Sequence, residues 1–149
     1  MRSKWNIFAR VLFILLLFLC VSPIGAAEPV GQIVVDYAAV LKANPMPPGE
    51  KTQLIPVGSD ESASVAVGRY APGAELKSHF HKTHSETVYV IEGTGLRTIE
   101  GKEIDVKPGS IHFNPMGKAH AIKNTGNVDM IFLSIFTPAM KGPDRVYVP

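Results

Sequence analysis

The sequence predicts an all-β domain in which short strands form an antiparallel barrel or sandwich. After Glu50, no stretch repeats its apolar residues at the period of about 3.6 residues that an amphipathic helix requires. The chain instead contains short runs rich in β-branched and aromatic residues, and glycine or proline stands between successive runs. Many short strands at nearly regular spacing, separated by turn signals, are typical of antiparallel β architectures.

The expected elements begin near residue 32. Residues 33–35 (Ile-Val-Val) have the composition of a short strand, and residues 36–41 fit one or two helical turns that the proline-rich segment 44–50 ends. The predicted strands that follow occupy residues 52–57, 62–70, 76–81, 87–92, 95–99, 103–106, 110–114, 119–124, 129–136 and 145–148. The turn signals between them include Pro72-Gly73, Glu92-Gly93, Glu100-Gly101, Pro108-Gly109 and Asn124-Thr125-Gly126.

The first residues have the layout of a secretory signal. Three basic residues precede an uninterrupted apolar run at 11–21, and the small residues 25–27 match a cleavage site. The run is short for a transmembrane helix, which requires about 20 apolar residues. We therefore expect residues 1–27 to be a signal peptide that is cleaved after Ala27, with an uncleaved anchor as the alternative. Residues 28–149 would then form one exported domain, periplasmic or secreted.

Removal of this signal changes the charge of the chain. The full sequence has 15 basic and 13 acidic residues, and three of the basic residues lie in the signal. The mature chain then has 12 basic residues against 13 acidic ones and no basic run, which argues against nucleic acid or a membrane surface as a stable partner. The single cysteine, Cys20, also lies in the signal, so a metal site in the domain must use histidine and carboxylate.

Three histidines and one glutamate form a pattern that indicates a metal site. His79 and His81 are two residues apart in a predicted strand, so their side chains project from the same face. Glu86 begins the next predicted strand and His120 begins a later one. Three imidazoles and one carboxylate that converge inside a barrel suit one divalent transition metal ion (Mn, Fe, Co, Ni, Cu or Zn) and leave one or two coordination positions open.

These residues are part of two longer patterns. The first pattern is Gly73, five residues, His79-Phe80-His81, four residues, Glu86, six residues, Gly93; the second is Gly109, five residues, Pro115-Met116-Gly117, two residues, His120, three residues, Asn124. Together, in order and with every fixed position filled, they resemble the two motifs of the cupin family. The resemblance spans Val65 to about Phe136.

The resemblance implies a double-stranded β-helix, or jelly-roll barrel, with a short N-terminal extension and a core at about 64–137. It also implies that His79, His81, Glu86 and His120 are the metal ligands. Because barrels of this family commonly pair, we also expect a homodimer.

Several apolar residues are candidates for a pocket beside the metal. Val88 and Val90 share the face of Glu86, and Phe113 and Ile122 are further candidates for the lining. Packing in the core is the more common role for such residues.

The remaining polar candidates are two histidines and two arginines. His84 lies in the turn after His81, where it can act as a proton shuttle or a fifth ligand, although exposed turn histidines are common. His112 is expected to face outward if its apolar neighbours face the core. Arg69 and Arg97 lie in predicted strands and can bind a carboxylate, with the surface as their default position.

Two functional classes fit these observations. The first is a small metal-dependent enzyme, an oxygenase or other oxidoreductase that acts on a small oxygenated organic substrate such as a carbonyl, enol or carboxylate compound. The alternative is a non-catalytic periplasmic protein that binds or senses a small ligand. The alternative is motivated by the lack of an identifiable acid–base group beyond the four ligands.

Overall fold

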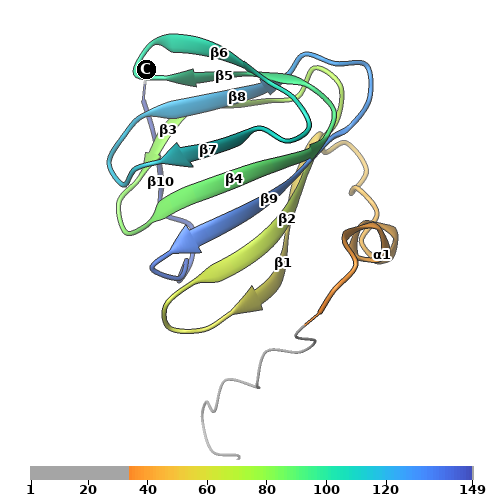
Figure 1. Ribbon diagram of the computed structural model, residues 1–149, viewed down its shortest axis with the longest axis horizontal. Coiled ribbons are helices and arrows are strands. Elements are labelled where there is room, and N and C mark those ends of the chain that lie inside the picture. The colour runs from red at the N-terminus through yellow and green to blue at the C-terminus, as the bar shows by residue number, and fades with distance from the viewer. Residues whose placement is uncertain (1–33, 149) are drawn as a thin grey trace, which may run out of the picture.

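Two antiparallel sheets of five strands each form the domain (Figure 1). The structure is a computed structural model that describes residues 34–148. Its elements are α1 (Tyr37–Ala43), β1 (Thr52–Ser59), β2 (Ser64–Tyr70), β3 (Glu75–His81), β4 (Ser85–Glu92), β5 (Gly95–Ile99), β6 (Lys102–Val106), β7 (Ile111–Asn114), β8 (His120–Asn124), β9 (Met130–Thr137) and β10 (Arg145–Tyr147). The predicted all-β fold is confirmed, and the strand bounds lie within a few residues of those expected.

The order of the strands joins segments that are far apart in the chain. The first sheet runs β1-β2-β9-β4-β7 and the second runs β10-β3-β8-β5-β6. The pairs β2–β9, β4–β9 and β3–β8 are all antiparallel and non-local. This crossing of chain order between two facing sheets is the arrangement of a double-stranded β-helix. It brings β3 and β8 together in one sheet, with β4 in the sheet that faces them.

The N-terminal part of the described chain is helical. Asp36 caps α1 by accepting a hydrogen bond from the Ala39 backbone N–H at 2.8 Å. The predicted strand at 33–35 is wrong for its described residues, since Val34 and Val35 pair with no other strand. The predicted signal peptide lies outside the described residues. Within residues 34–148, no helix is long and apolar enough to cross a membrane.

The core lies between the two sheets. Tyr70, Val90, Met130 and Phe132 are almost completely buried there, and the rings of Tyr70 and Phe132 meet edge to face with their centroids 4.9 Å apart. Gly68 lies opposite Phe132 on the neighbouring strand, and the Phe132 ring occupies the space where a Cβ atom at this position would lie. The glycine therefore lets a large ring fill the end of the barrel.

Asn124, at the end of β8, forms side-chain hydrogen bonds to two other parts of the chain. Its completely buried side-chain amide donates hydrogen bonds to the carbonyl oxygens of Tyr70 (2.7 Å) and Val128 (2.8 Å). Its side-chain oxygen accepts a hydrogen bond from the Gly126 backbone N–H at 2.9 Å. A buried amide with all of these partners fixes one conformation of the backbone. The strand that carries His120 is thereby held in register.

Candidate metal centre

Three histidine side chains converge on the inner face of the second sheet. His79 and His81 alternate with outward residues along β3, and His120 of β8 lies directly opposite His79. The three side chains are 1%, 3% and 5% exposed, in that order. One ring nitrogen from each lies within 4.8 Å of the other two. We call His79, His81 and His120 the histidine cluster, and this spacing is suitable for a single metal ion.

Hydrogen bonds at Nδ1 determine which ring nitrogen faces the interior. His79 Nδ1 lies 2.8 Å from the carbonyl oxygen of Lys77, and His120 Nδ1 lies 2.9 Å from that of Lys118. A carbonyl oxygen can only accept, so Nδ1 carries the proton in each ring and Nε2 presents a free lone pair. His120 Nε2 is buried and has no hydrogen-bond partner. An unpartnered buried nitrogen of this kind fits a metal ligand.

The third histidine of the cluster is oriented by a carboxylate. Asp144 Oδ1 lies 2.7 Å from His81 Nδ1, while Asp144 Oδ2 accepts hydrogen bonds from the backbone N–H groups of Lys82 and Thr83 at 3.0 Å and from the Thr83 hydroxyl at 2.8 Å. Burial raises the pKa of Asp144, but these hydrogen bonds outweigh it and lower the pKa to about 2. A carboxylate behind a histidine is a common support for a metal ligand.

Glu86 approaches the histidine cluster from the opposite sheet. Its Oε2 atom lies 3.7 Å from His120 Nε2 and 4.0 Å from His81 Nε2. Ser134 donates a hydrogen bond to Oε1 at 2.7 Å, and the Asn114 amide donates one to Oε2 at 2.9 Å. Burial raises the pKa of Glu86, yet hydrogen bonds that include these two lower it to about 2. The carboxylate is therefore ionised at neutral pH, as a metal ligand must be.

Arg97 supports this carboxylate indirectly, through Asn114. The Arg97 guanidinium is buried and donates hydrogen bonds to the side-chain oxygen of Asn114 and to the carbonyl oxygen of Phe113. It thereby orients the Asn114 amide towards Glu86. The default surface position expected for Arg97 is wrong. Arg69 donates hydrogen bonds to the Gln53 side-chain oxygen and to the Asn44 carbonyl oxygen. Neither Arg69 nor Arg97 lines the small cavity that adjoins the histidine cluster.

His84 packs against His81, on the side where Asp144 lies. Its ring is 1% exposed and stacks at a tilt on His81, with the centroids 4.3 Å apart. His84 Nδ1 lies 3.4 Å from Asp144 Oδ2, and burial lowers the pKa of the imidazole. The expectation of an exposed turn histidine is wrong. His81, His84 and Asp144 form a second group with the spacing of a metal site, although it shares His81 with the first.

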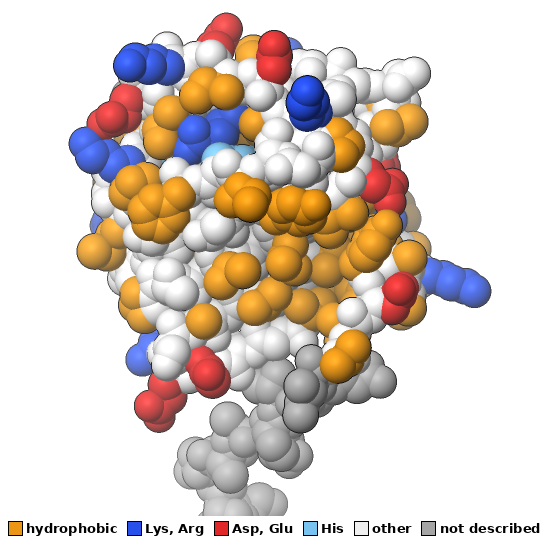
Figure 2. Space-filling view, in the orientation of Figure 1, with side chains coloured by type: hydrophobic (Ala, Val, Ile, Leu, Met, Phe, Trp, Pro, Cys, Tyr) orange, Lys and Arg blue, Asp and Glu red, His pale blue; other side chains and the backbone are white. Residues whose placement is uncertain are grey.

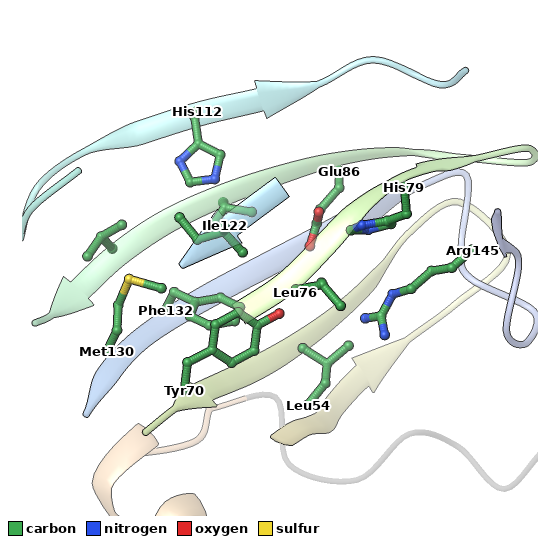
Figure 3. A pocket seen from close by; sticks show the side chains of 12 residues that line it. Leu54, Tyr70, Leu76, His79, Glu86, His112, Ile122, Met130, Phe132 and Arg145 are labelled. Carbon is green, nitrogen blue, oxygen red and sulfur yellow. The ribbon is translucent and has the colours of Figure 1, made fainter. Parts of the chain in front are cut away.

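A small cavity of about 30 Å³ adjoins the histidine cluster (Figure 3). The cavity is mostly apolar, and Val88, Val90 and Ile122 are among its lining residues. Its polar lining comes from Tyr70, His79, Glu86, His112 and Arg145. We call this space the main cavity. Its size and lining suit a small ligand with a few polar groups.

The predicted orientation of β7 is wrong. Phe113 is 54% exposed and Ile111 is 70% exposed, so neither faces the interior, and Phe113 does not line the main cavity. His112 instead faces inward, where its Nδ1 atom is buried without a hydrogen-bond partner. Burial is the main cause that lowers the pKa of His112 to about 4. Alternation fixed the two faces of this strand but could not decide which face the barrel encloses.

Comparison with known proteins agrees with this geometry. Residues 66–136 match the family model described as Cupin domain. The match covers just under half of the chain, so this region is similar to a cupin domain. All three residues of the histidine cluster and Glu86 lie inside the matched region, whereas Asp144 and Arg145 lie outside it.

Among curated relatives, the chain resembles the oxalate-binding protein of Thermotoga maritima. The two sequences are 36% identical over 64 residues, which cover 43% of this chain and 53% of that protein. The chain thus spans about half the length of the curated relatives that it matches first.

Solved structures show the same fold. A conserved protein with a double-stranded β-helix domain from Klebsiella pneumoniae superimposes with a TM-score of 0.64 at 24% identity, over 75% of this chain and 95% of that one. A predicted oxalate decarboxylase from Thermotoga maritima superimposes with a TM-score of 0.55 at 27% identity, over 58% of this chain and 80% of that one. The cupin jelly-roll architecture is therefore shared with both.

The buried imidazoles make the stability of the metal-free protein depend on pH. Burial is the largest cause that lowers the pKa of His79 to about 4, and the pKa of His112 is similarly about 4. As the pH falls from about 6.5 to about 4, histidines in the unfolded chain take up protons that the folded protein excludes. We expect the free energy of unfolding to fall across this window by about 1.4 kcal/mol per pH unit for each such histidine.

Denaturant unfolding of chelator-treated protein at several pH values measures this dependence. The variant His112→Gln should show a shallower slope between pH 6.5 and 4, because it lacks one of the two groups. A free energy of unfolding that stays constant over this window in the wild type would contradict the pKa values of the buried rings.

Proposed function

We propose that His79, His81, Glu86 and His120 bind one divalent transition metal ion. The observation that carries this proposal is the orientation of the three imidazoles. Nδ1 of each ring is engaged, and Nε2 of His81 and of His120 lies within 4.0 Å of the ionised Glu86 carboxylate. Three neutral nitrogens and one carboxylate form a ligand set that suits Mn, Fe, Co, Ni, Cu or Zn. The ion would also balance the buried negative charge of Glu86.

The proposed activity is that of a small metal-dependent enzyme acting on a small oxygenated organic compound. A bound metal ion supplies Lewis acidity towards a substrate oxygen. The chain itself supplies a mostly apolar main cavity and two polar groups, Tyr70 and His112, that line it outside the four ligands. The pKa of His112, about 4, leaves its ring neutral at pH 7, so it can act as a proton acceptor outside the four ligands, a role that the sequence analysis had not assigned to it. This feature favours the enzyme over the non-catalytic binding or sensing protein.

The similar proteins support this class of ligand. One relative is an oxalate-binding protein, and one structural neighbour is a predicted oxalate decarboxylase. Both names refer to a small oxygen-rich acid. We therefore place small organic acids first among candidate substrates.

Replacement of a ligand should abolish retention of the metal. We expect one equivalent of metal in the wild-type protein and less than about a tenth of this in His81→Ala and His120→Ala, because two remaining imidazoles and one carboxylate form an incomplete site. Asp144→Asn should weaken metal binding by about 10- to 100-fold, since it removes the charge behind His81. Elemental analysis and titration calorimetry measure both effects.

The matched control is His112→Gln, which changes a histidine of the same barrel outside the histidine cluster and should retain the full equivalent. Unchanged metal content in His81→Ala or His120→Ala would refute the proposed site.

Turnover distinguishes the enzyme from the binding protein. Protein loaded with iron or manganese should convert at least one member of a panel of phenolic, enol and dicarboxylate compounds, as measured by oxygen uptake and product analysis. His112→Gln should lower the rate with less effect on ligand affinity, as expected for a proton-transfer group. Saturable binding of a panel compound that is recovered unchanged would favour the sensing alternative.

Export remains a proposal that rests on the sequence alone. Residues 1–27 have the layout of a cleavable signal. Protein recovered from the periplasm or the medium should have the intact mass of residues 28–149, with Glu28 as its first residue. A mass that includes residues 1–27 would instead support a retained anchor.

We also propose that the protein forms a homodimer through the outer face of the first sheet. Tyr89 of β4 is 43% exposed and pairs with Ile111 of β7, and the exposed Phe113 lies on the same face. Figure 2 shows apolar side chains gathered on the face that this view presents. Exposed apolar patches commonly mark protein interfaces, and a second copy of the chain offers the same surface for a symmetric contact.

Light scattering tests this pairing. The wild type should have the mass of two chains at micromolar concentration, and Phe113→Glu should shift the mass towards one chain because it buries a charge in the contact. Ile104→Glu is the matched control, since Ile104 is 49% exposed but lies on β6 of the other sheet. A single-chain mass for the wild type would refute the dimer.

A further inference from the structure

β10 adds a cationic residue to the inner face that carries the histidine cluster. In the antiparallel pair of β10 and β3, Arg145 lies opposite His81 and Tyr147 lies opposite His79. Residues directly opposite one another in an antiparallel pair project to the same side of the sheet. The register therefore places Arg145 on the side of the sheet that carries His81. Its side chain is exposed but also lines the main cavity, where Figure 3 shows the guanidinium on the side of Leu54 and Leu76.

The Arg145 side chain lies at the border between the main cavity and an outer groove. It lines both the main cavity of about 30 Å³ and a groove of about 420 Å³ whose other lining residues include Met140, Pro143 and Tyr147. Leu54 and Arg145 are the two residues common to both linings. A ligand that enters the main cavity from this groove passes the guanidinium.

The guanidinium is not used by the fold. Within residues 34–148, it forms no hydrogen bond or ion pair, although Asp144 precedes it directly in the chain. The Asp144 carboxylate is instead committed to His81, Lys82 and Thr83. A cationic group without an internal carboxylate, beside a mostly apolar space, is available for an anionic ligand.

Tyr70 adds a second donor to the same cavity. Its ring is 6% exposed, and burial raises the pKa of the phenol, so the hydroxyl keeps its proton at neutral pH. Figure 3 shows the hydroxyl directed into the main cavity, on the side of Leu76 and Arg145. The cavity thus has donors from Arg145 and Tyr70 in the same lining as His79 of the histidine cluster and Glu86.

We propose that Arg145 binds the carboxylate of a small organic acid whose second oxygen-bearing group lies at the histidine cluster. The inference rests on the proposed metal site and defines its substrate class as short dicarboxylates and 2-oxo or 2-hydroxy acids. Arg145 is the residue that determines specificity for the acid, since its planar fork matches a carboxylate. The small volume of the main cavity favours the shortest of these acids over larger anions.

The experiment compares ligand binding in metal-loaded wild type, Arg145→Gln and Arg145→Lys. Calorimetry with oxalate, malonate and pyruvate reports carboxylate affinity, imidazole reports access to the metal without a carboxylate, and elemental analysis reports metal content. Lys107→Gln is the matched control, because it removes one positive charge from an exposed site outside both linings.

We expect Arg145→Gln to weaken binding of at least one acid by about 10- to 100-fold, as for loss of charge-assisted hydrogen bonds. Arg145→Lys, which keeps the charge but not the fork, should recover part of this affinity. Metal content and imidazole affinity should stay as in the wild type, and Lys107→Gln should bind the acids normally.

Other outcomes separate this inference from the proposed function. If the wild type holds no metal, the proposed site and the inference both fail. If the metal is present but Arg145→Gln binds every acid as tightly as the wild type, the metal site stands and the role of Arg145 is refuted. Tighter binding of inorganic phosphate than of any acid would likewise overturn the assignment to carboxylates.

Discussion

The candidate metal centre depends on the hydrogen bonds that fix the three imidazole rings. Strand alternation directs His79, His81 and His120 into the barrel, but a ring that rotates freely does not present one particular nitrogen. The rings of His79 and His120 are fixed in the same way, because Nδ1 of each donates a hydrogen bond to the backbone carbonyl oxygen two residues earlier in the chain. His81 uses Asp144 instead. The inward direction of all three Nε2 atoms is thus built by backbone and carboxylate acceptors.

A second constraint follows from the charge inside the barrel. Glu86 is ionised and accepts hydrogen bonds from the neutral donors Ser134 and Asn114, and among residues 34–148 it is the only carboxylate that lines the main cavity. Hydrogen bonds from neutral donors stabilise a buried carboxylate less than a neighbouring cation does. Such an interior is suited to a divalent ion, and the same electrostatics favour an additional anion only where Arg145 supplies positive charge.

The sequence predicted the fold and the convergence of the histidine cluster with Glu86, because alternation and turn signals are local properties. It did not predict the supporting residues. Asp144 is 63 positions from His81, and no local pattern connects them. Ser134 and Asn114 reach Glu86 only through strand pairs that the fold creates. For β7 the period was right but the face was wrong, since apolar Ile111 and Phe113 were assumed to be internal and His112 external.

The position of β10 has a consequence for the order in which the site is assembled during synthesis. All nine other strands precede β10 in the chain, so His79, His81, Glu86 and His120 are translated before Asp144 and Arg145. A nascent chain that has folded only through β9 contains the ligand set but lacks the carboxylate behind His81. Firm capture of the proposed ion and selection of an anionic ligand would therefore follow the synthesis of β10, so that cofactor acquisition would come late in the folding of this domain.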